Sequence, residues 1–229
     1  MKHKVVSKDE WTKARIELLK KEKEWTRAKD ELSQMRRDLP WVKIDKKYIF
    51  ETNEGARSLF DLFGDRSQLI VYHFMLNPEW NEGCRGCSFL MDNLPARMEH
   101  FNQKDVAFVA VSQAPLEKIN AFKKRMEWDF KWASSFGSDF NYDFHVAFKP
   151  EDVKAGEIYY NYQTTKDDVM SDREGLSVFY REGDNIYHTY STYARGLDIL
   201  LATYNYLDLT PKGRDEKENM RWVKHHDKY

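Results

Sequence analysis

The chain has 229 residues and a mass of 27.4 kDa; 41% of its residues are hydrophobic and 15% aromatic, which excludes an intrinsically disordered protein. The formal net charge of -1 argues against a general nucleic-acid binder, because such proteins carry a basic excess. No apolar run approaches the ~20 residues that span a bilayer, and charge interrupts the N-terminus too early for a signal peptide. We therefore expect a cytoplasmic protein that binds neither nucleic acid nor a membrane.

Residues 7–39 are predicted to form one long helix. Ser7 and Glu10 match a capping box, in which each side chain satisfies a free backbone N–H group near the other. Apolar residues then recur at alternating steps of four and three, with Lys21 as the one polar break: Trp11, Ala14, Leu18, Trp25, Ala28, Leu32, Met35 and Leu39. Such a narrow apolar stripe needs a partner surface, either its own domain or the second subunit of a homodimer.

Charge and composition divide the chain into three parts. Residues 1–40 carry a formal charge of +4 and the remainder carries -5, so a basic helical arm precedes an acidic body. The body is expected over residues 41–210, and a polar C-terminal tail over residues 211–229. Within this tail, Trp222 and Val223 are the expected points of contact with the body.

The body is predicted to alternate strands and helices. Continuous apolar runs predict buried strands at 69–76 and 106–111. Other expected elements are a short strand at 47–50, a helix at 90–101 kinked at Pro95, a helix from Pro115 to Met126, a hairpin of strands 176–180 and 186–190, and a final helix at 197–207. Strand–helix–strand units pair in parallel and the hairpin adds antiparallel strands, so we expect an α/β fold with a mixed sheet.

An aromatic-rich insertion occupies about residues 137–175. A loop of this length inside a compact domain is rarely without structure. Its aromatic residues are Phe140, Tyr142, Phe144, Phe148, Tyr159, Tyr160 and Tyr162. The insertion is interpreted either as a flap anchored on the sheet by these rings or as a lid over a functional site.

The chain has two cysteines, and they stand three apart as Cys84-Arg85-Gly86-Cys87. They follow a predicted buried strand and open a helix, at the edge of the sheet where α/β proteins bind ligands. Backbone N–H groups and the helix dipole favour a thiolate at Cys84, and Arg85 adds a positive charge. Cys87, one turn into the helix, is placed to attack a mixed disulfide on Cys84. We therefore predict Cys84 as the nucleophile and Cys87 as the resolving thiol.

Two other interpretations of the cysteines remain open. A structural zinc site needs four ligands, whereas the chain offers two sulfurs and no pair of histidines at chelating spacing. Inert buried cysteines are the other possibility. We expect no metal and no cofactor. With only two cysteines, turnover requires an external thiol or disulfide partner, or a small-molecule oxidant.

Four further residues are candidates for supporting the cysteines. His73, in the strand before them, can move the proton that Cys87 must lose, or it is a hydrogen-bonded core residue. Arg173, before the strand at 176–180, can stabilise a thiolate or lie on a surface loop. Trp80 can shield the site or simply pack, and Arg85 lies between the two thiols.

The order of elements and the C-x-x-C pair resemble the thioredoxin superfamily over about residues 45–208. More specifically, the chain resembles a bacterial thioredoxin-like family of unknown function, related in fold to alkyl hydroperoxide reductase and thiol-specific antioxidant proteins. The segments carrying this resemblance are WNEGCRGCSF, VSQAPLEKINAFKKRM, GSDFNYDF, GLSVFYR and HTYSTYARGLDILLATYNYLDLTPKGRD. The resemblance implies a three-layer α/β/α thioredoxin-like domain.

The sequence departs from the superfamily at two positions. The segment EGLSVFY lacks the proline that precedes the corresponding strand in thioredoxins, and Asn81-Glu82-Gly83 lacks the threonine that precedes the reactive cysteine of peroxiredoxins. The predicted function is a thiol–disulfide oxidoreductase. The alternatives are a non-catalytic thioredoxin-like binding protein and a peroxidase-like thiol antioxidant.

Overall fold

The computed structural model describes residues 3–167 and 169–229. The chain separates into two compact units, one ending at Pro40 and the other running from Trp41 to Tyr229. The first unit is essentially one helix, α1 (Lys8–Arg37), and the predicted capping box of Ser7 and Glu10 is present at its N-terminus. The helix ends at Arg37, before Pro40, which cannot continue a helix.

The second unit is built on an eight-stranded mixed sheet with the order β1-β10-β9-β4-β5-β6-β2-β3. The strands are β1 (Val42–Lys43), β2 (Ile49–Thr52), β3 (Gly55–Ser58), β4 (Gln68–His73), β5 (Val106–Ser112), β6 (Trp132–Ser134), β9 (Gly175–Glu182) and β10 (Asn185–Tyr193). Strands β4, β5 and β6 are parallel, and β9 and β10 form an antiparallel hairpin that pairs with β4. The predicted turn at Glu182–Asn185 closes this hairpin.

The four central strands have the arrangement of the thioredoxin fold. A strand–helix–strand unit, β4 and β5, is followed by the hairpin β9–β10, and the order in the sheet is β10-β9-β4-β5. Leu69, Val71 and Tyr72 of β4 are buried, as expected for a strand covered on both faces. The expected α/β fold with a mixed sheet and a long N-terminal helix is therefore confirmed.

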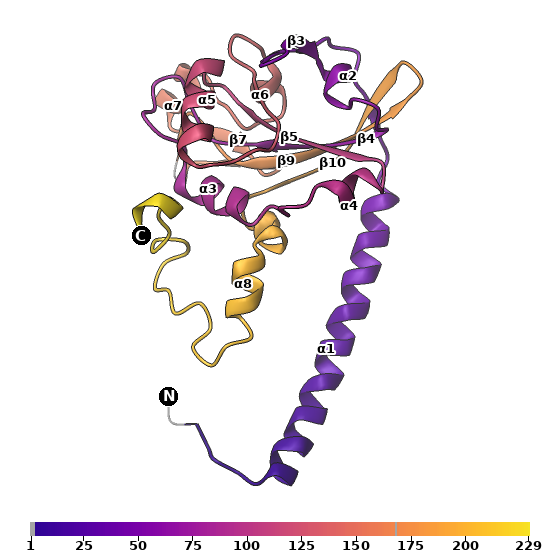
Figure 1. The fold of residues 1–229 in the computed structure, drawn as a ribbon, viewed down its shortest axis with the longest axis vertical. Coiled ribbons are helices and arrows are strands. Elements are labelled where there is room, and N and C mark those ends of the chain that lie inside the picture. The colour runs from indigo at the N-terminus through magenta and orange to yellow at the C-terminus, as the bar shows by residue number, and fades with distance from the viewer. Residues whose placement is uncertain (1–2, 168) are drawn as a thin grey trace. The chain divides into compact units, whose positions relative to one another are not determined.

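Two hydrophobic cores lie on opposite faces of this sheet, so the unit has three layers. One core joins the sheet to α3 (Arg85–Asp92), α5 (Leu116–Arg125), the 3-10 helix η1 (Ala194–Leu200) and α8 (Ala202–Leu207). The other joins it to α2 (Leu59–Leu62) and α6 (Phe140–Asp143). Figure 1 shows α3 and α8 on one side of the sheet and α2 and α6 on the other.

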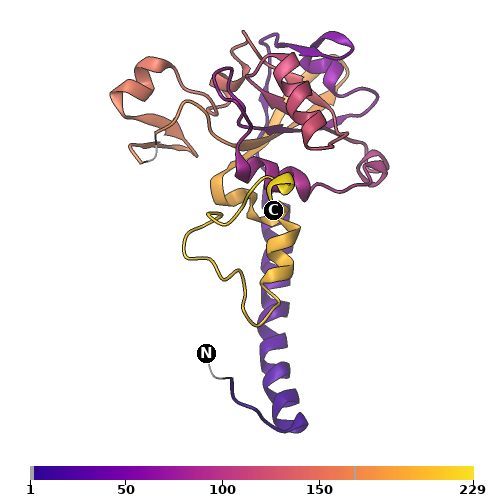
Figure 2. The same ribbon diagram turned by 60° about the vertical axis from the view of Figure 1, so that its left-hand side comes forward.

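The insertion at 137–175 contains α6, α7 (Pro150–Ala155) and a two-stranded sheet of β7 (Ile158–Tyr160) and β8 (Gln163–Thr165). Helix α7 and strands β7 and β8 stand to one side of the main sheet (Figure 2). Four rings of the insertion, Phe140, Phe144, Phe148 and Tyr160, are buried in the core that contains α2. These rings anchor a flap on the core opposite the cysteines, while the end of the insertion, at Glu174, lines the cysteine pocket.

Two helices and one strand differ most from the prediction. The helix expected at 90–101 is two helices, α3 and α4 (Glu99–Asn102), because α3 is capped at Asn93 and Pro95 follows. The helix expected at 197–207 starts as the 3-10 helix η1 and becomes α-helical only at Ala202. Strand β6 was not predicted. At the C-terminus, Val223 is buried and Trp222 packs edge-on against Phe89, so both expected contacts of the tail are present.

Candidate functional site

The cysteines lie where the fold changes from strand to helix. After β4 the chain crosses the edge of the sheet, and Cys84 is the N-cap residue of α3. The Cys84 N–H donates to the Met75 carbonyl (3.0 Å), and the Cys84 carbonyl accepts from the Ser88 N–H (2.9 Å). A side chain at Gly83 would come within 2.9 Å of the rings of Phe74 and Phe122, so only glycine fits before Cys84. Packing of this loop therefore fixes the position of Cys84.

The two thiols differ in exposure and in acidity. Both cysteines are free; Cys84 is partly buried, and Cys87 is only 2% exposed. The S–H of Cys87 donates to the Cys84 sulfur and, together with the backbone N–H groups of Cys87 and Gly86, lowers the pKa of Cys84 to about 7 despite its burial. Burial raises the pKa of Cys87 well above its usual value, and the neighbouring Cys84 charge raises it further. Of the two thiols, Cys84 is therefore the first to ionise.

The side chain of Tyr72, in β4, forms a hydrogen bond with the buried thiol of Cys87. Its side chain is 1% exposed, and burial raises its pKa well above 10, so the hydroxyl remains a donor. The hydrogen bond between Tyr72 and the Cys87 sulfur lowers the pKa of Cys87, against the larger effect of burial. The Met75 N–H also donates to the Cys87 sulfur, at 3.5 Å. A thiolate formed at Cys87 therefore meets two donors.

Two carboxyl groups come from the segment before β9. Glu174 lines the same pocket as the cysteines, and its negative charge raises the pKa of both thiols. Asp172 is 1% exposed, and its Oδ2 has no hydrogen-bond partner. Burial raises the pKa of Asp172 well above its usual value, and the charge of Cys84 adds to this effect. Sequence reasoning missed both residues; their place before the strand that pairs with β4 was the available signal.

A pocket of about 560 Å³ opens over the thiols. Its wall combines the cysteine helix, the η1 segment and the C-terminal residues Glu218–Arg221. The Met220 sulfur would lie 3.4 Å from a side-chain carbon at Gly86, and the Cys84 sulfur 3.8 Å from it. Met220 has a left-handed backbone conformation (φ +58°), which is uncommon for a residue with a side chain. The end of the chain thus forms one side of the cysteine pocket.

The C-terminal residues are bonded to the loop that carries Cys84. His225 is 1% exposed; its Nε2–H donates to the Gly83 carbonyl (2.9 Å), and its Nδ1 faces the Arg125 guanidinium at 3.4 Å. Glu82 pairs with Lys228 and Arg125, each at 2.8 Å, and these two partners lower the pKa of Glu82 to about 2. No helical or strand periodicity marked His225 in the sequence.

His73 is not part of the cysteine site, so the support expected from it is wrong. Side chains alternate along a strand, and Tyr72 takes the face with the cysteines, which leaves His73 on the other face. There its Nε2 bonds to the Ser177 hydroxyl (2.8 Å), and its ring packs against Phe140 and Phe144. Burial lowers its pKa to about 3. The core interpretation of His73 is the correct one.

The other three residues that were expected to support the cysteines lie in three different surroundings. Arg85 is exposed, begins α3 and lines the cysteine pocket. Trp80 is partly buried and packs against the core cluster that contains Cys84. Arg173 lies over the ring of Tyr160, another residue of the insertion, with 5.4 Å between the guanidinium carbon and the ring centroid. Of the three, Arg85 is beside the thiols.

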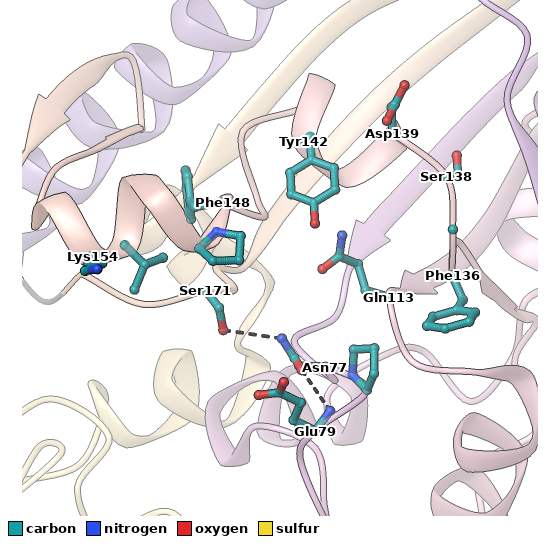
Figure 3. Close-up of a pocket in the computed structure, with 14 residues that line it drawn as sticks. Asn77, Glu79, Gln113, Phe136, Ser138, Asp139, Tyr142, Phe148, Lys154 and Ser171 are labelled. Atoms are coloured by element: carbon teal, nitrogen blue, oxygen red, sulfur yellow. Dashed lines mark hydrogen bonds between the residues drawn. The ribbon is translucent and has the colours of Figure 1, made fainter.

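A second pocket, of about 660 Å³, lies where β4, β5 and β6 end (Figure 3). The Asn77 amide spans part of it, donating to the Ser171 hydroxyl (3.3 Å) and accepting from the Glu79 N–H (2.9 Å). The Gln113 amide and the Tyr142 hydroxyl point toward its interior (Figure 3). This pocket offers both uncharged hydrogen-bonding groups and the charged side chains of Glu79, Asp139 and Lys154, and no cysteine lines it.

Metal binding and membrane insertion have no support in the described residues. Over residues 3–167 and 169–229, no cluster of three or more His, Cys, Asp or Glu side chains is placed to hold a metal ion. In the same part of the chain, no helix has both the length and the apolar composition required to cross a bilayer.

Fold and site together define a thioredoxin-fold protein with two adjacent thiols at the start of the helix after β4. The chain belongs to the family described as "Bacterial protein of unknown function (DUF899)", which matches residues 1–229. The resemblance to a bacterial thioredoxin-like family is thereby confirmed. No curated protein is similar to the chain.

Several solved structures resemble the chain distantly. The bacterioferritin comigratory protein of Xanthomonas campestris is 13% identical and has a TM-score of 0.46, covering 73% of this chain and 96% of its own. Peroxidoxin BcpB of Mycobacterium tuberculosis is 13% identical (TM-score 0.45, 74% and 97% covered), and a putative protein disulfide isomerase of Bacteroides thetaiotaomicron is 15% identical (TM-score 0.42, 78% and 94% covered). At these scores the similarities carry no argument about chemistry.

Proposed function

We propose that the chain is a thiol–disulfide oxidoreductase in which Cys84 is the nucleophile and Cys87 the resolving thiol. One observation carries the proposal: Cys84, the N-cap residue of α3, lines an open pocket, while Cys87 beside it is only 2% exposed. The lowering of the Cys84 pKa to about 7 and the raising of the Cys87 pKa agree with these positions. Near neutral pH, a large fraction of Cys84 is then thiolate, the reactive form, while Cys87 keeps its proton.

The proposed reaction transfers two electrons to a substrate disulfide. The Cys84 thiolate attacks one sulfur of the disulfide, forms a mixed disulfide and expels the first thiolate, which takes up a proton. Cys87 then loses its proton and attacks the Cys84 sulfur, which releases the second thiolate. The net change is one disulfide between Cys84 and Cys87, oxidised from two thiols, and two product thiols. The donors from Tyr72 and Met75 stabilise Cys87 as its charge forms.

Turnover requires a reductant from outside the chain, because its only two cysteines are consumed in one cycle. The partner class is therefore an external dithiol, a protein or a small molecule. We propose the cytoplasm as the setting, since its thiol pool can return the pair to the reduced state. The segment before Cys84 lacks the threonine hydroxyl that precedes the reactive cysteine of peroxiredoxins, and its Glu82 pairs with Arg125 and Lys228 instead. We therefore favour a disulfide over a peroxide as the substrate.

The proposal is tested by trapping the mixed disulfide with oxidised glutathione. In Cys87→Ser the resolving thiol is missing, so mass spectrometry should find one glutathione on Cys84. In Cys84→Ser no adduct should form at the same pH, because Cys87 is buried and protonated. The unmodified chain should instead end with a disulfide between Cys84 and Cys87 and release two glutathione molecules per chain.

Three outcomes would reject the proposal. The first is a Cys84 pKa at or above the ~8.5 of a free thiol, together with no adduct in Cys87→Ser, which would indicate a non-catalytic binding protein. The second is an adduct on Cys87 rather than Cys84. The third is formation of the disulfide with hydrogen peroxide, through a sulfenic acid on Cys84, but not with oxidised glutathione; that result would assign a peroxidase.

A further inference from the structure

Helix α1 is a compact unit by itself and carries an apolar stripe along its length. None of the residues of α1 is buried. The large side chains of the stripe are between 44% and 66% exposed: Trp11, Leu18, Trp25, Leu32, Met35 and, just beyond the helix, Leu39. Over 30 residues, or about 45 Å of helix, this is too much contiguous apolar surface to leave in water without a partner.

The stripe has the heptad repeat of a coiled coil. One set of residues recurs every seven positions, and a second set follows it by three: Trp11, Leu18, Trp25, Leu32 and Leu39 in the first, Ala14, Lys21, Ala28 and Met35 in the second. These are the a and d positions, whose side chains face the partner helix. The one polar member, Lys21, lies 2.9 Å from Glu24 of the same helix, so its charge already has a partner.

The charges beside the stripe identify the partner. The residue before each a position is acidic in every heptad, and the residue after each d position is basic in three of four. The acidic set, at g positions, is Glu10, Glu17, Glu24, Glu31 and Asp38; the other set, at e positions, is Arg15, Glu22, Lys29 and Arg36. A helix with one acidic and one basic border is complementary to a second copy of itself.

Orientation follows from the same two borders. In a parallel, in-register pair each g residue meets the e residue five positions later on the other helix, which gives Glu10 with Arg15, Glu24 with Lys29 and Glu31 with Arg36. The remaining pair, Glu17 with Glu22, is like-charged, but Arg15 of the same helix lies 2.7 Å from Glu22 and would be shared between Glu22 and Glu10 of the second helix. An antiparallel pair would set g against g, acid against acid throughout. We infer that α1 forms a parallel coiled-coil homodimer with α1 of a second copy.

The first test is the mass of the full chain in solution. Light scattering on the eluting peak should give twice 27.4 kDa at micromolar concentration. Leu18→Glu with Leu32→Glu places charges on the seam and should give a monomer. The matched control, Lys13→Glu with Arg27→Glu, changes the outer face of the same helix and should remain a dimer. A monomeric unmodified chain, or a seam variant that stays dimeric, would overturn the inference.

The second test reports orientation by crosslinking, in a chain with Cys84→Ser and Cys87→Ser. Ala14→Cys places a thiol at a d position, which faces its own copy only in a parallel, in-register dimer, so mild oxidation should crosslink most of the protein. Lys13→Cys, one residue away and directed outward, should stay uncrosslinked. Equal crosslinking at both positions, or none at position 14 in a dimer, would exclude the parallel arrangement.

The third test uses charge reversal. Glu24→Lys sets two lysines against each other in both symmetric pairs and should weaken the dimer about tenfold. Adding Lys29→Glu restores opposite charges and should restore the dissociation constant. In an antiparallel dimer Glu24→Lys would instead relieve a repulsion and tighten the dimer, which would contradict the inference. None of these measurements depends on Cys84 or Cys87, so their outcome is independent of the proposed function.

Discussion

The Nε2–H of His225 donates to the carbonyl of Gly83 at 2.9 Å, which bonds the C-terminal segment to the residue directly before Cys84. Both partners are buried. Glycine at position 83 is required by the rings of Phe74 and Phe122, so the acceptor has little freedom to move. His225 therefore fastens the end of the chain to the most constrained part of the cysteine loop.

Replacing His225 should destabilise the fold substantially. His225→Ala removes the bond to Gly83 and the contact with Arg125 and leaves a cavity, so we expect a loss of about 2–4 kcal/mol in the free energy of unfolding, measured in urea. The matched control is His226→Ala. That neighbour is 41% exposed and pairs with Asp92 near the surface, so its loss should stay below about 1 kcal/mol. Equal losses in the two variants would contradict the anchoring role.

Replacing Cys87 should raise the pKa of Cys84, by an amount that depends on whether the new side chain can donate a hydrogen bond. Cys87→Ala removes the donor to the Cys84 sulfur and should raise the pKa of Cys84 by about one unit from about 7. Cys87→Ser keeps a donor at the same place and should raise it less. The measurement is the rate of iodoacetamide alkylation against pH, which reports one thiol in each variant. Identical pKa values would show that Cys87 does not bond to Cys84.

The two carboxyl groups before β9 should act differently on Cys84. The negative charge of Glu174 raises the pKa of Cys84, so Glu174→Gln should lower it below about 7. Burial raises the pKa of Asp172 well above its usual value and so favours its neutral form, and Asp172→Asn should therefore change the pKa of Cys84 less than Glu174→Gln does. The same alkylation profile measures both. A large shift in Asp172→Asn would mean that Asp172 is charged in the reduced protein.

Much of the fold could be predicted because local signals agreed with the tertiary structure. The capping box at Ser7, the apolar strands β4 and β5 and the turn at Glu182–Asn185 each depend on neighbouring residues alone. Strand β6 could not be found, because three residues ending in a serine give no periodicity. The break after α3 was available in Asn93 and Pro95, which stop a helix rather than bend it.

The candidate site was predictable at its centre and not at its periphery. Cys84 and Cys87 could be identified because they follow a predicted strand and open a predicted helix. The direction of His73 could not be derived, because β4 is buried on both faces and its apolar run shows no alternation. The identities of Tyr72, Asp172 and His225 as neighbours of the cysteine loop depend on chain crossings that no local pattern encodes.

His73 should make the protein sensitive to acid. Its pKa in the folded protein is about 3, below the ~6.5 of the unfolded chain, because burial disfavours the charged ring. Between these values the unfolded state binds a proton that the native state does not, so stability should fall as pH drops from about 6.5 to about 3.

The contribution of His73 to this slope is about 1.4 kcal/mol per pH unit. His73→Leu cannot take up the proton, and its free energy of unfolding should fall less steeply over the same pH range. Alkylation of Cys84 serves as the control, because His73 lies on the opposite face of the sheet and the pKa of Cys84 should not change. An unchanged slope would show that another group governs the acid limit.

Residues Glu218–Arg221 form one wall of the pocket beside Cys84 and belong to neither the sheet nor α3. The sheet and α3 hold the sulfur in place, whereas a segment from the end of the chain determines how large a molecule can approach it. Release of that segment would widen the entrance while every strand kept its register. Residues Glu218–Arg221 would therefore limit the size of a molecule that reaches Cys84, while the sheet and α3 set the position of its sulfur.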